Sequence, residues 1–223
     1  MSVKLFFESI IKFVIGAILV GLLLFIPAGT FKYINGLLFM CLLFIPMFIV
    51  GIIMMIKSPN LLKERLDVKE KDVKQKKVVG ISAVMFILGF VVAGLNYRYN
   101  WIKLPNIVVI ISSVIFILSY IMYAVVLKQN AFLARTIKVD KDQKLITTGL
   151  YSIVRHPMYT ATIFLFLSMH LVLNSLISFI IFLIYPFVIV ARINNEEEVL
   201  EKELKGYKEY RRKVRYKLIP FIW

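Results

Sequence analysis

Long uncharged apolar runs are the feature that most constrains the fold of this chain. Four of them cover residues 13–28, 33–56, 78–97 and 104–127. The last three each provide about the 20 residues that a helix needs to cross roughly 30 Å of hydrocarbon. The first is shorter, but it extends back to Leu5 if Glu8 and Lys12 pair one helical turn apart. Because hydrophobic residues make up 60% of the chain, the sequence predicts an all-α integral membrane protein.

A fifth uncharged run, residues 158–191, is too long for one ordinary crossing, since a single helix over it would measure roughly 50 Å. A single crossing would also separate the basic C-terminal tail from the other basic segments. A helical hairpin with its bend near His170, Asn174 and Ser175 removes both conflicts. We therefore predict about four transmembrane helices, a C-terminal membrane helical hairpin with two short arms, and a cytoplasmic amphipathic tail helix over residues 195–205.

The formal net charge of +15 does not indicate nucleic-acid binding, because the basic residues lie between the apolar runs. Residues 57–77, 128–156 and the tail from Arg192 onward are rich in Lys and Arg. The alternate loops carry only Lys32, and Arg98 with Lys103. This positive-inside pattern predicts a multi-pass protein whose N-terminus, two basic loops and tail lie in the cytoplasm. The basic faces would attract anionic membrane lipids.

The first polar cluster lies at the start of the fifth run and contains Arg155, His156, Pro157 and Tyr159. Proline suits the first turn of a helix, where its missing N–H costs nothing. A helix that begins at Pro157 would direct free backbone N–H groups and its positive dipole end toward a carboxylate or phosphate. The alternative interpretation is an interfacial anchor, with arginine bound to lipid phosphate and the rings at the membrane boundary.

The second polar cluster follows the fifth run and contains Arg192, Glu196, Glu197 and Glu198. The hairpin would bring it to the same cytoplasmic side as the first cluster. Adjacent carboxylates can accept hydrogen bonds from ribose hydroxyls or an ammonium group. Alternatively, Arg192 and Glu196 simply pair on one helix face. Aromatic residues that recur among the basic residues of the tail are typical of the headgroup boundary; they are Tyr207, Tyr210, Tyr216 and Trp223.

Together, these residues resemble the isoprenylcysteine carboxyl methyltransferase (ICMT) family and the wider group of integral membrane methyltransferases that includes phospholipid methyltransferases. The resemblance covers roughly residues 142–223. It rests on the Arg-His-Pro-x-Tyr element followed, after a hairpin, by a glutamate pair. Further matches are Gln143, Thr148, Gly149, Tyr151, Ile193, Leu200, Gly206, Tyr207, Tyr210, Val214, Arg215, Tyr216, Ile219 and Pro220. Leu150 and Ala161 depart from it, where the family usually has proline and glycine.

The resemblance implies a membrane-embedded methyltransferase that uses S-adenosyl-L-methionine. No second histidine or carboxylate stands at metal-ligand spacing from His170, so we predict no metal. It implies a transmembrane scaffold over residues 1–128 and a cofactor-binding methyltransferase region over residues 129–223, within one integrated membrane domain. The implied cofactor-binding residues are Tyr151, His156, Tyr159, Glu196 and Glu197. Arg155 and Arg192 are the implied catalytic residues, which would hold an anionic group. The run of three glutamates leaves open which two contact the cofactor.

Other functions remain open from the sequence. We favour a lipidic or prenylated acceptor with a carboxylate, and a phospholipid or other amine comes second. A sterol-reductase-like enzyme with NADPH would share a similar C-terminal architecture. A non-enzymatic lipid-binding membrane protein is the remaining alternative. The residues of the apolar spans are generic, so they do not identify the acceptor.

Overall fold

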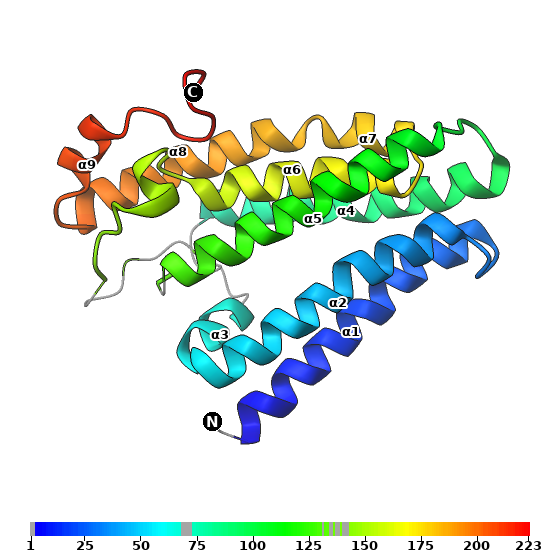
Figure 1. Cartoon of the computed structure of the whole chain (residues 1–223), viewed down its shortest axis with the longest axis horizontal. Helices are drawn as coiled ribbons and strands as arrows, with labels where there is room; N and C mark the ends of the chain where they lie inside the picture. Colours follow the sequence, from blue (N-terminus) through cyan, green and yellow to red (C-terminus); the bar gives the residue numbers. More distant parts are fainter. Residues whose placement is uncertain (1–2, 68–72, 131, 134–135, 137–138, 140–142) are drawn as a thin grey trace.

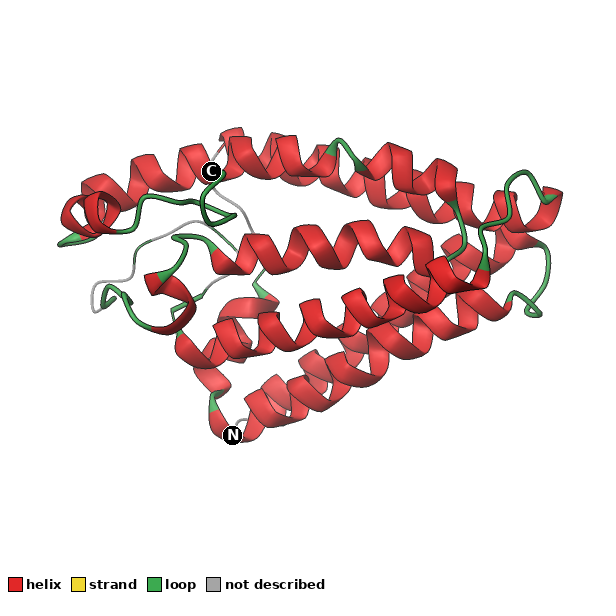
Figure 2. Cartoon of the chain, turned by 45° about the horizontal axis from the view of Figure 1, so that its top comes forward, coloured by secondary structure: helices red, strands yellow, loops and turns green. Residues whose placement is uncertain are grey.

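The computed structural model describes residues 3–67, 73–130, 132, 133, 136, 139 and 143–223. Within these residues the chain consists of helices and loops, without a strand (Figures 1 and 2). Helices long and apolar enough to cross a membrane are α1 (Val3–Ala28), α2 (Ile34–Lys57), α4 (Val73–Tyr99), α5 (Asn106–Gln129), and α7 (Leu176–Phe182) together with α8 (Tyr185–Glu203). The predicted all-α membrane fold is confirmed.

The first crossing contains the predicted ion pair between Glu8 and Lys12 near its start. In α1 the Lys12 Nζ lies 2.6 Å from a Glu8 carboxylate oxygen, one helical turn away. The same ammonium donates to the Leu66 carbonyl at 2.8 Å, at the end of α3 (Pro59–Leu66). The pairing lowers the cost of placing both charges at the membrane boundary. The loop that follows α2 is therefore partly helical and is tied to the start of α1.

The predicted hairpin is present, and its bend lies at Asn174 and Ser175. The shorter helix α6 (Pro157–Val172) ends just before them, and Asn174 has a left-handed φ of 55°, which asparagine tolerates better than most residues. The Asn174 side chain accepts from the Leu104 amide at 2.7 Å. The Ser175 side chain caps α7 by accepting from the Ser178 amide. These bonds satisfy the polar backbone of the bend.

The second arm of the hairpin differs from the prediction, because only α6 is short. After α7, the chain continues through α8 to Glu203, and residues 176–203 together contain an apolar segment long enough to cross a membrane. The predicted tail helix over residues 195–205 is the end of α8 and is not a separate element. Good helix formers, including Leu200 and Lys202, extend the helix beyond the apolar segment. The separate tail helix is α9 (Tyr207–Lys213), which begins after Gly206 at φ 84°.

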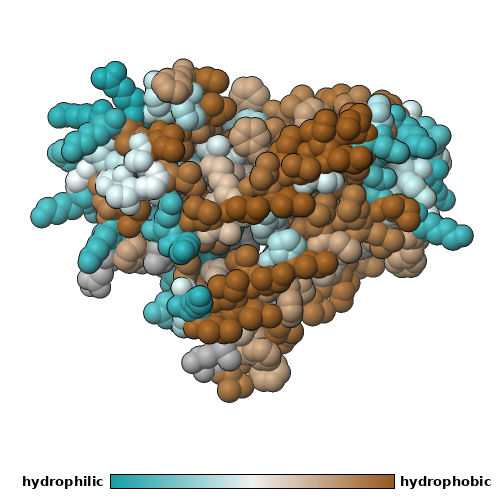
Figure 3. Space-filling view, in the orientation of Figure 1, coloured by the Kyte–Doolittle hydropathy of each residue, from teal (hydrophilic) through white to brown (hydrophobic). Residues whose placement is uncertain are grey.

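The ends of the molecule are polar and its middle is apolar (Figure 3). The N-terminus, α3 and α9 lie at one end, which we call the basic end, while the loops that join α1 to α2 and α4 to α5 lie at the other (Figure 1). Between the ends, α5 packs along α6, and α1 packs along α4. Phe39, Phe116 and Phe182 are fully buried in the core. The bundle therefore holds the start of α6 and the end of α8 together at the basic end.

Candidate functional site

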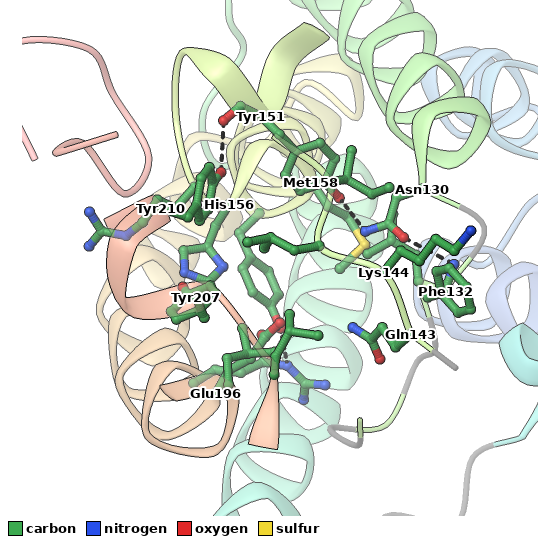
Figure 4. A pocket seen from close by; sticks show the side chains of 18 of the residues that line it. Asn130, Phe132, Gln143, Lys144, Tyr151, His156, Met158, Glu196, Tyr207 and Tyr210 are labelled. Atoms are coloured by element: carbon green, nitrogen blue, oxygen red, sulfur yellow. Dashed lines mark hydrogen bonds between the residues drawn. The ribbon is translucent and has the colours of Figure 1, made fainter. Parts of the chain in front are cut away.

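A cavity at the basic end, the site cavity, lies between the end of α5, the 3₁₀ turn η1 (Gly149–Ser152), the first turn of α6, and the helices α8 and α9. Figure 4 shows His156, Tyr207 and Tyr210 on one side of it, and Asn130 and Phe132 on the other. Its described lining residues are Asn130, Phe132, Leu133, Thr136, Gln143, Lys144, Leu145, Ile146, Tyr151, Arg155, His156, Met158, Tyr159, Arg192, Glu196, Leu200, Leu204, Tyr207 and Tyr210. Side chains from both sequence clusters thus face one space.

The residues that sequence reasoning selected are brought together, but they occupy two layers. Most of them line the site cavity; these are Tyr151, Arg155, His156, Tyr159, Arg192 and Glu196. Glu197 is buried, with 4% of its surface exposed, and lies behind the cavity wall. Glu198 is exposed on the next position of α8. The helical rotation of about 100° per residue separates these three neighbouring carboxylates.

Glu197 is the centre of a buried polar cluster. One of its carboxylate oxygens accepts from the Arg155 Nε at 2.7 Å, from the His156 Nε2 at 3.1 Å and from the Tyr207 hydroxyl at 3.3 Å. The other oxygen lies 3.2 Å from the Lys217 ammonium. Since a carboxylate only accepts, the His156 Nε2 carries the hydrogen. The cluster satisfies a buried charge that would otherwise cost several kcal/mol.

Arg155 joins this cluster to the C-terminal tail. Its Nη1 donates to the carbonyls of Val214 and Arg215, both at 2.8 Å. The backbone amides of Arg155 and His156 also donate to carbonyls of the same tail segment, each at 2.9 Å. Arg155 is 6% exposed, and the bonds of its guanidinium clamp the start of α6 to the tail. Its predicted role of holding an anionic group is not tested by this geometry.

Tyr159 connects the two other charged residues of the cavity wall. Its hydroxyl donates to a Glu196 carboxylate oxygen at 2.5 Å and accepts from the Arg192 Nε at 2.9 Å. The Arg192 guanidinium lies 6.0 Å from the Tyr159 ring centroid, within cation–π range. The Tyr159 phenol of α6 therefore links Arg192 and Glu196, which lie one turn apart on α8. This contact fixes both charges at the surface of the site cavity.

Tyr151 lies in η1 and also lines the site cavity. Its hydroxyl accepts from the Asn130 Nδ2 at 3.1 Å, and its carbonyl accepts from the Tyr210 hydroxyl at 2.7 Å. Burial raises the pKa of Tyr151 to about 12, while the hydrogen bond from Asn130 lowers this pKa. The phenol is consequently neutral at physiological pH. It contributes an aromatic face and a neutral hydroxyl to the site cavity.

Two tyrosines of α9 correct the sequence-based interpretation. Tyr207 and Tyr210 are 3% and 4% exposed, and they pack with Leu204 against the site cavity. They are not headgroup anchors, as the tail composition suggested. Burial raises the pKa of both phenols. The two tyrosines are three residues apart and follow Gly206, where a helix can begin. This spacing is the sequence signal that could have placed both on one buried helix face.

Gly149 has a conformation that side chains rarely adopt, with φ at 62°. A Cβ there would lie 2.4 Å from the Gln129 Nε2. The same side chain is held in place because its Oε1 accepts from the Leu150 amide. We expect Gly149→Ala to displace Gln129 and destabilise the turn that carries Tyr151, by about 1–3 kcal/mol. Thermal unfolding in detergent would measure this loss, with Gly16→Ala as control because its Cβ would meet nothing within 4 Å. Equal melting temperatures for the two variants would contradict the expectation.

Among the described residues, no group of three or more His, Cys, Asp or Glu side chains could hold a metal ion. The predicted absence of a metal from the reaction stays a prediction. What the site cavity does offer is tyrosine rings, a carboxylate, an arginine and the first turn of a helix. These groups suit a ligand that carries a cationic centre, hydroxyl groups and a carboxylate.

Comparison with known proteins gives a family match over part of this chain. The family model described as Isoprenylcysteine carboxyl methyltransferase (ICMT) family matches residues 108–202. The match begins earlier than the predicted resemblance, since it includes most of α5, and it ends before α9 and the tail. A search of curated proteins finds no match. The family match supports the predicted resemblance to this family over residues 108–202, and the apolar helices agree with a membrane protein.

Proposed function

We propose that this protein transfers a methyl group from S-adenosyl-L-methionine to a carboxylate of a lipidic or prenylated acceptor. The observation that carries the proposal is the convergence of both polar clusters on one cavity at the basic end of a membrane bundle. The family match supports methyl transfer. The cofactor, the carboxylate preference and the residue roles are our inferences from the groups that line the site cavity.

The groups of the cavity wall fit the cofactor part by part. The aromatic faces of Tyr151, Tyr159 and Tyr207 can stabilise a sulfonium cation. Glu196 can accept hydrogen bonds from ribose hydroxyls or from the ammonium of the methionine part. The first turn of α6, which begins at Pro157, suits that part's carboxylate. We propose that His156 and Glu197 complete the binding region by fixing this turn against α8.

The protein's contribution to the reaction is mainly positioning. S-adenosyl-L-methionine, when bound, supplies an electrophilic methyl group. A carboxylate acceptor is already ionised at pH 7, so the site requires no general base. Arg192, fixed by the Tyr159 hydroxyl, can hold the carboxylate by a bidentate contact and orient one oxygen. Burial of the cavity wall limits water, which strengthens these charged contacts.

The topology supports a further part of the proposal. We infer that residues 129–223 bind the cofactor, that residues 1–128 serve as the scaffold, and that the basic end faces the cytoplasm, following the positive-inside rule. A soluble cofactor would then enter from the cytoplasm, and a lipid acceptor would enter from the bilayer. Accessibility labelling of single cysteines at Lys141 and Trp223 tests this orientation. Labelling of the two positions from opposite sides would overturn it.

A binding measurement tests the cofactor proposal. We expect S-adenosylhomocysteine to bind the purified protein in calorimetry, and Glu196→Gln to weaken binding at least tenfold, since a hydrogen bond to a charged group contributes about 1.5–3 kcal/mol. Glu198→Gln, the control on the exposed neighbour, should bind like the wild-type protein. Labelled-methyl transfer into a lipid extract would then separate ester from amine products.

The same experiment distinguishes the alternatives. Stabilisation by NADPH alone would overturn methyl transfer and favour a reductase. Binding of neither nucleotide would favour a lipid-binding protein without catalysis. Equal affinities of Glu196→Gln and Glu198→Gln for S-adenosylhomocysteine would retain the function but reject the assignment of Glu196.

A further inference from the structure

A second cavity, of about 240 Å³, lies at the end of the molecule opposite the basic end, and we call it the far cavity. Three segments form it: the α1–α2 loop with the start of α2, the end of α4 with the loop that follows, and the hairpin bend. Both loops can be followed at this end in Figure 1. The described lining includes four asparagines, two lysines and two tyrosines. Segments that are far apart in the sequence thus enclose one polar space.

Hydrogen bonds between these segments fix the walls of the far cavity. The Asn96 Nδ2 donates to the Asn174 carbonyl of the hairpin bend at 3.0 Å. The Tyr33 hydroxyl donates to the Leu173 carbonyl, and the Tyr33 ring stacks on Tyr97 with the ring centroids 4.4 Å apart. A ligand that enters such a preorganised space has little protein motion to freeze, which favours binding.

The far cavity is positively charged. Lys32 and Lys103 line it, and residues 9–63, 73–139 and 143–195 contain no Asp or Glu. The segments that form the cavity therefore supply no negative charge to balance the two ammonium groups. A concave space lined by charge of one sign attracts ions of the opposite sign. Asn100 also lines the cavity and adds an amide that can donate to an anion's oxygen.

The edge of the far cavity favours a lipid headgroup over a soluble anion. Ile34 and Ile102 line the cavity and are 69% and 38% exposed, so they join it to the apolar outer face of the bundle. Tyr99 and Trp101 stack beside this edge, and such rings are typical of the headgroup level. The cavity volume is below the roughly 300–1,000 Å³ of pockets that enclose a whole small molecule. It suits a headgroup whose chains stay in the bilayer.

We propose that the far cavity binds the phosphodiester headgroup of an anionic membrane phospholipid. Lys32 and Lys103 balance the charge of the phosphate, and Asn100 donates to one of its oxygens. The ammonium of a zwitterionic headgroup would bring another cation beside the two lysines, so the site selects an anionic lipid. The bound headgroup connects the α1–α2 loop with the α4–α5 loop and stabilises the end of the bundle that holds the hairpin bend. This site is independent of methyl transfer.

Photolabelling of the full-length protein in lipid nanodiscs tests the inference. The probe is a phosphatidylglycerol with a diazirine in its headgroup, and a phosphatidylcholine with the same group is the comparison. Mass spectrometry maps the label to residues 30–35 and 96–103, which separates this site from the basic end, where anionic lipids also gather. Lys32→Gln and Lys103→Gln each remove one charge from the cavity. Arg98→Gln is the matched control, because Arg98 lies at the same end but outside the described lining.

We expect phosphatidylglycerol to label these residues more strongly than phosphatidylcholine does. Lys32→Gln and Lys103→Gln should each reduce this labelling about fivefold, the size expected for one basic residue at a membrane surface. Arg98→Gln should label like the wild-type protein, and Lys103→Arg, which keeps the charge, should retain most of the signal. Phosphatidylglycerol should also raise the melting temperature less in the two lysine variants than in Arg98→Gln, since a ligand stabilises the state that it binds.

Equal losses of labelling in Lys32→Gln, Lys103→Gln and Arg98→Gln would overturn the inference, because they would indicate a general attraction of this end for anionic lipid. Equal labelling by the two lipids would overturn it as well. Displacement of the probe by millimolar inorganic phosphate would reject the lipid and assign the cavity to a soluble anion. Melting temperatures in lipid-free detergent, equal for all variants, would show that a loss of labelling reflects the site and not the fold.

Discussion

Glu197→Ala is expected to lower the melting temperature by about 10 °C and to abolish binding of S-adenosylhomocysteine. The carboxylate accepts from Arg155 and His156 and pairs with Lys217. Its removal leaves the charges of Arg155 and Lys217 without a buried counterion, which typically costs about 3–5 kcal/mol. At this chain length such a loss corresponds to a shift of this size. Differential scanning fluorimetry in detergent measures the stability, and calorimetry measures the binding.

The physical basis of this expectation is that Glu197 lies behind the cavity wall. It acts on the cofactor through the residues that it fixes, and Glu196 faces the cavity itself. Glu196→Gln should therefore weaken binding while the melting temperature stays within a few degrees of the wild-type value. Glu198→Ala, on the exposed side of α8, should change neither quantity. A Glu197→Ala protein as stable as Glu198→Ala would contradict the buried cluster.

The sequence predicted the crossings well because hydrocarbon imposes a length and excludes charge. The four uncharged runs correspond to α1, α2, α4 and α5, with their ends shifted by a few residues. The hairpin followed from one physical conflict between length and topology, and Asn174 and Ser175 mark its bend. The start of α6 at Pro157 was also predictable, since proline is favoured in the first turn.

The second arm and the tail were less predictable, because helix ends depend on tertiary contacts. Nothing in the local sequence of residues 195–203 separates a new helix from the continuation of α8. The buried positions of Tyr207 and Tyr210 depend on contacts with η1 and with residue 197. Lys217 lies in a basic and aromatic tail that is typical of the headgroup boundary. Only the fold places its ammonium beside Glu197 and Asn194.

The division of the glutamates shows the same limit. The sequence contains three adjacent carboxylates, and it predicts that they lie near the Arg-His-Pro-x-Tyr element. Which one faces the cavity depends on the rotation of α8 about its axis, since neighbouring residues point about 100° apart. Packing of Ile189 and Ile193 in the core fixes that rotation. Glu196 consequently faces the cavity and Glu197 faces the tail.

Arg192→Met is expected to reduce kcat for methyl transfer roughly 100-fold while binding of S-adenosylhomocysteine changes by no more than a few fold. The substitution keeps the length of the side chain and removes the charge that the Tyr159 hydroxyl fixes on the cavity wall. A charged contact to a reacting carboxylate is worth about 1.5–3 kcal/mol, which corresponds to about one to two orders of magnitude in rate. Initial-rate measurements with labelled cofactor separate kcat from KM.

Arg192→Lys and Arg155→Met complete this test, because they separate charge, geometry and fold. Lysine keeps the charge but loses the planar fork, so we expect an intermediate rate. Arg155 is bound by Glu197 and by two tail carbonyls, and its loss should lower the melting temperature as well as the activity. If Arg192→Met keeps the wild-type kcat, the carboxylate is oriented by another group. If Arg155→Met loses activity at an unchanged melting temperature, Arg155 itself contacts the ligand and is more than a clamp for the tail.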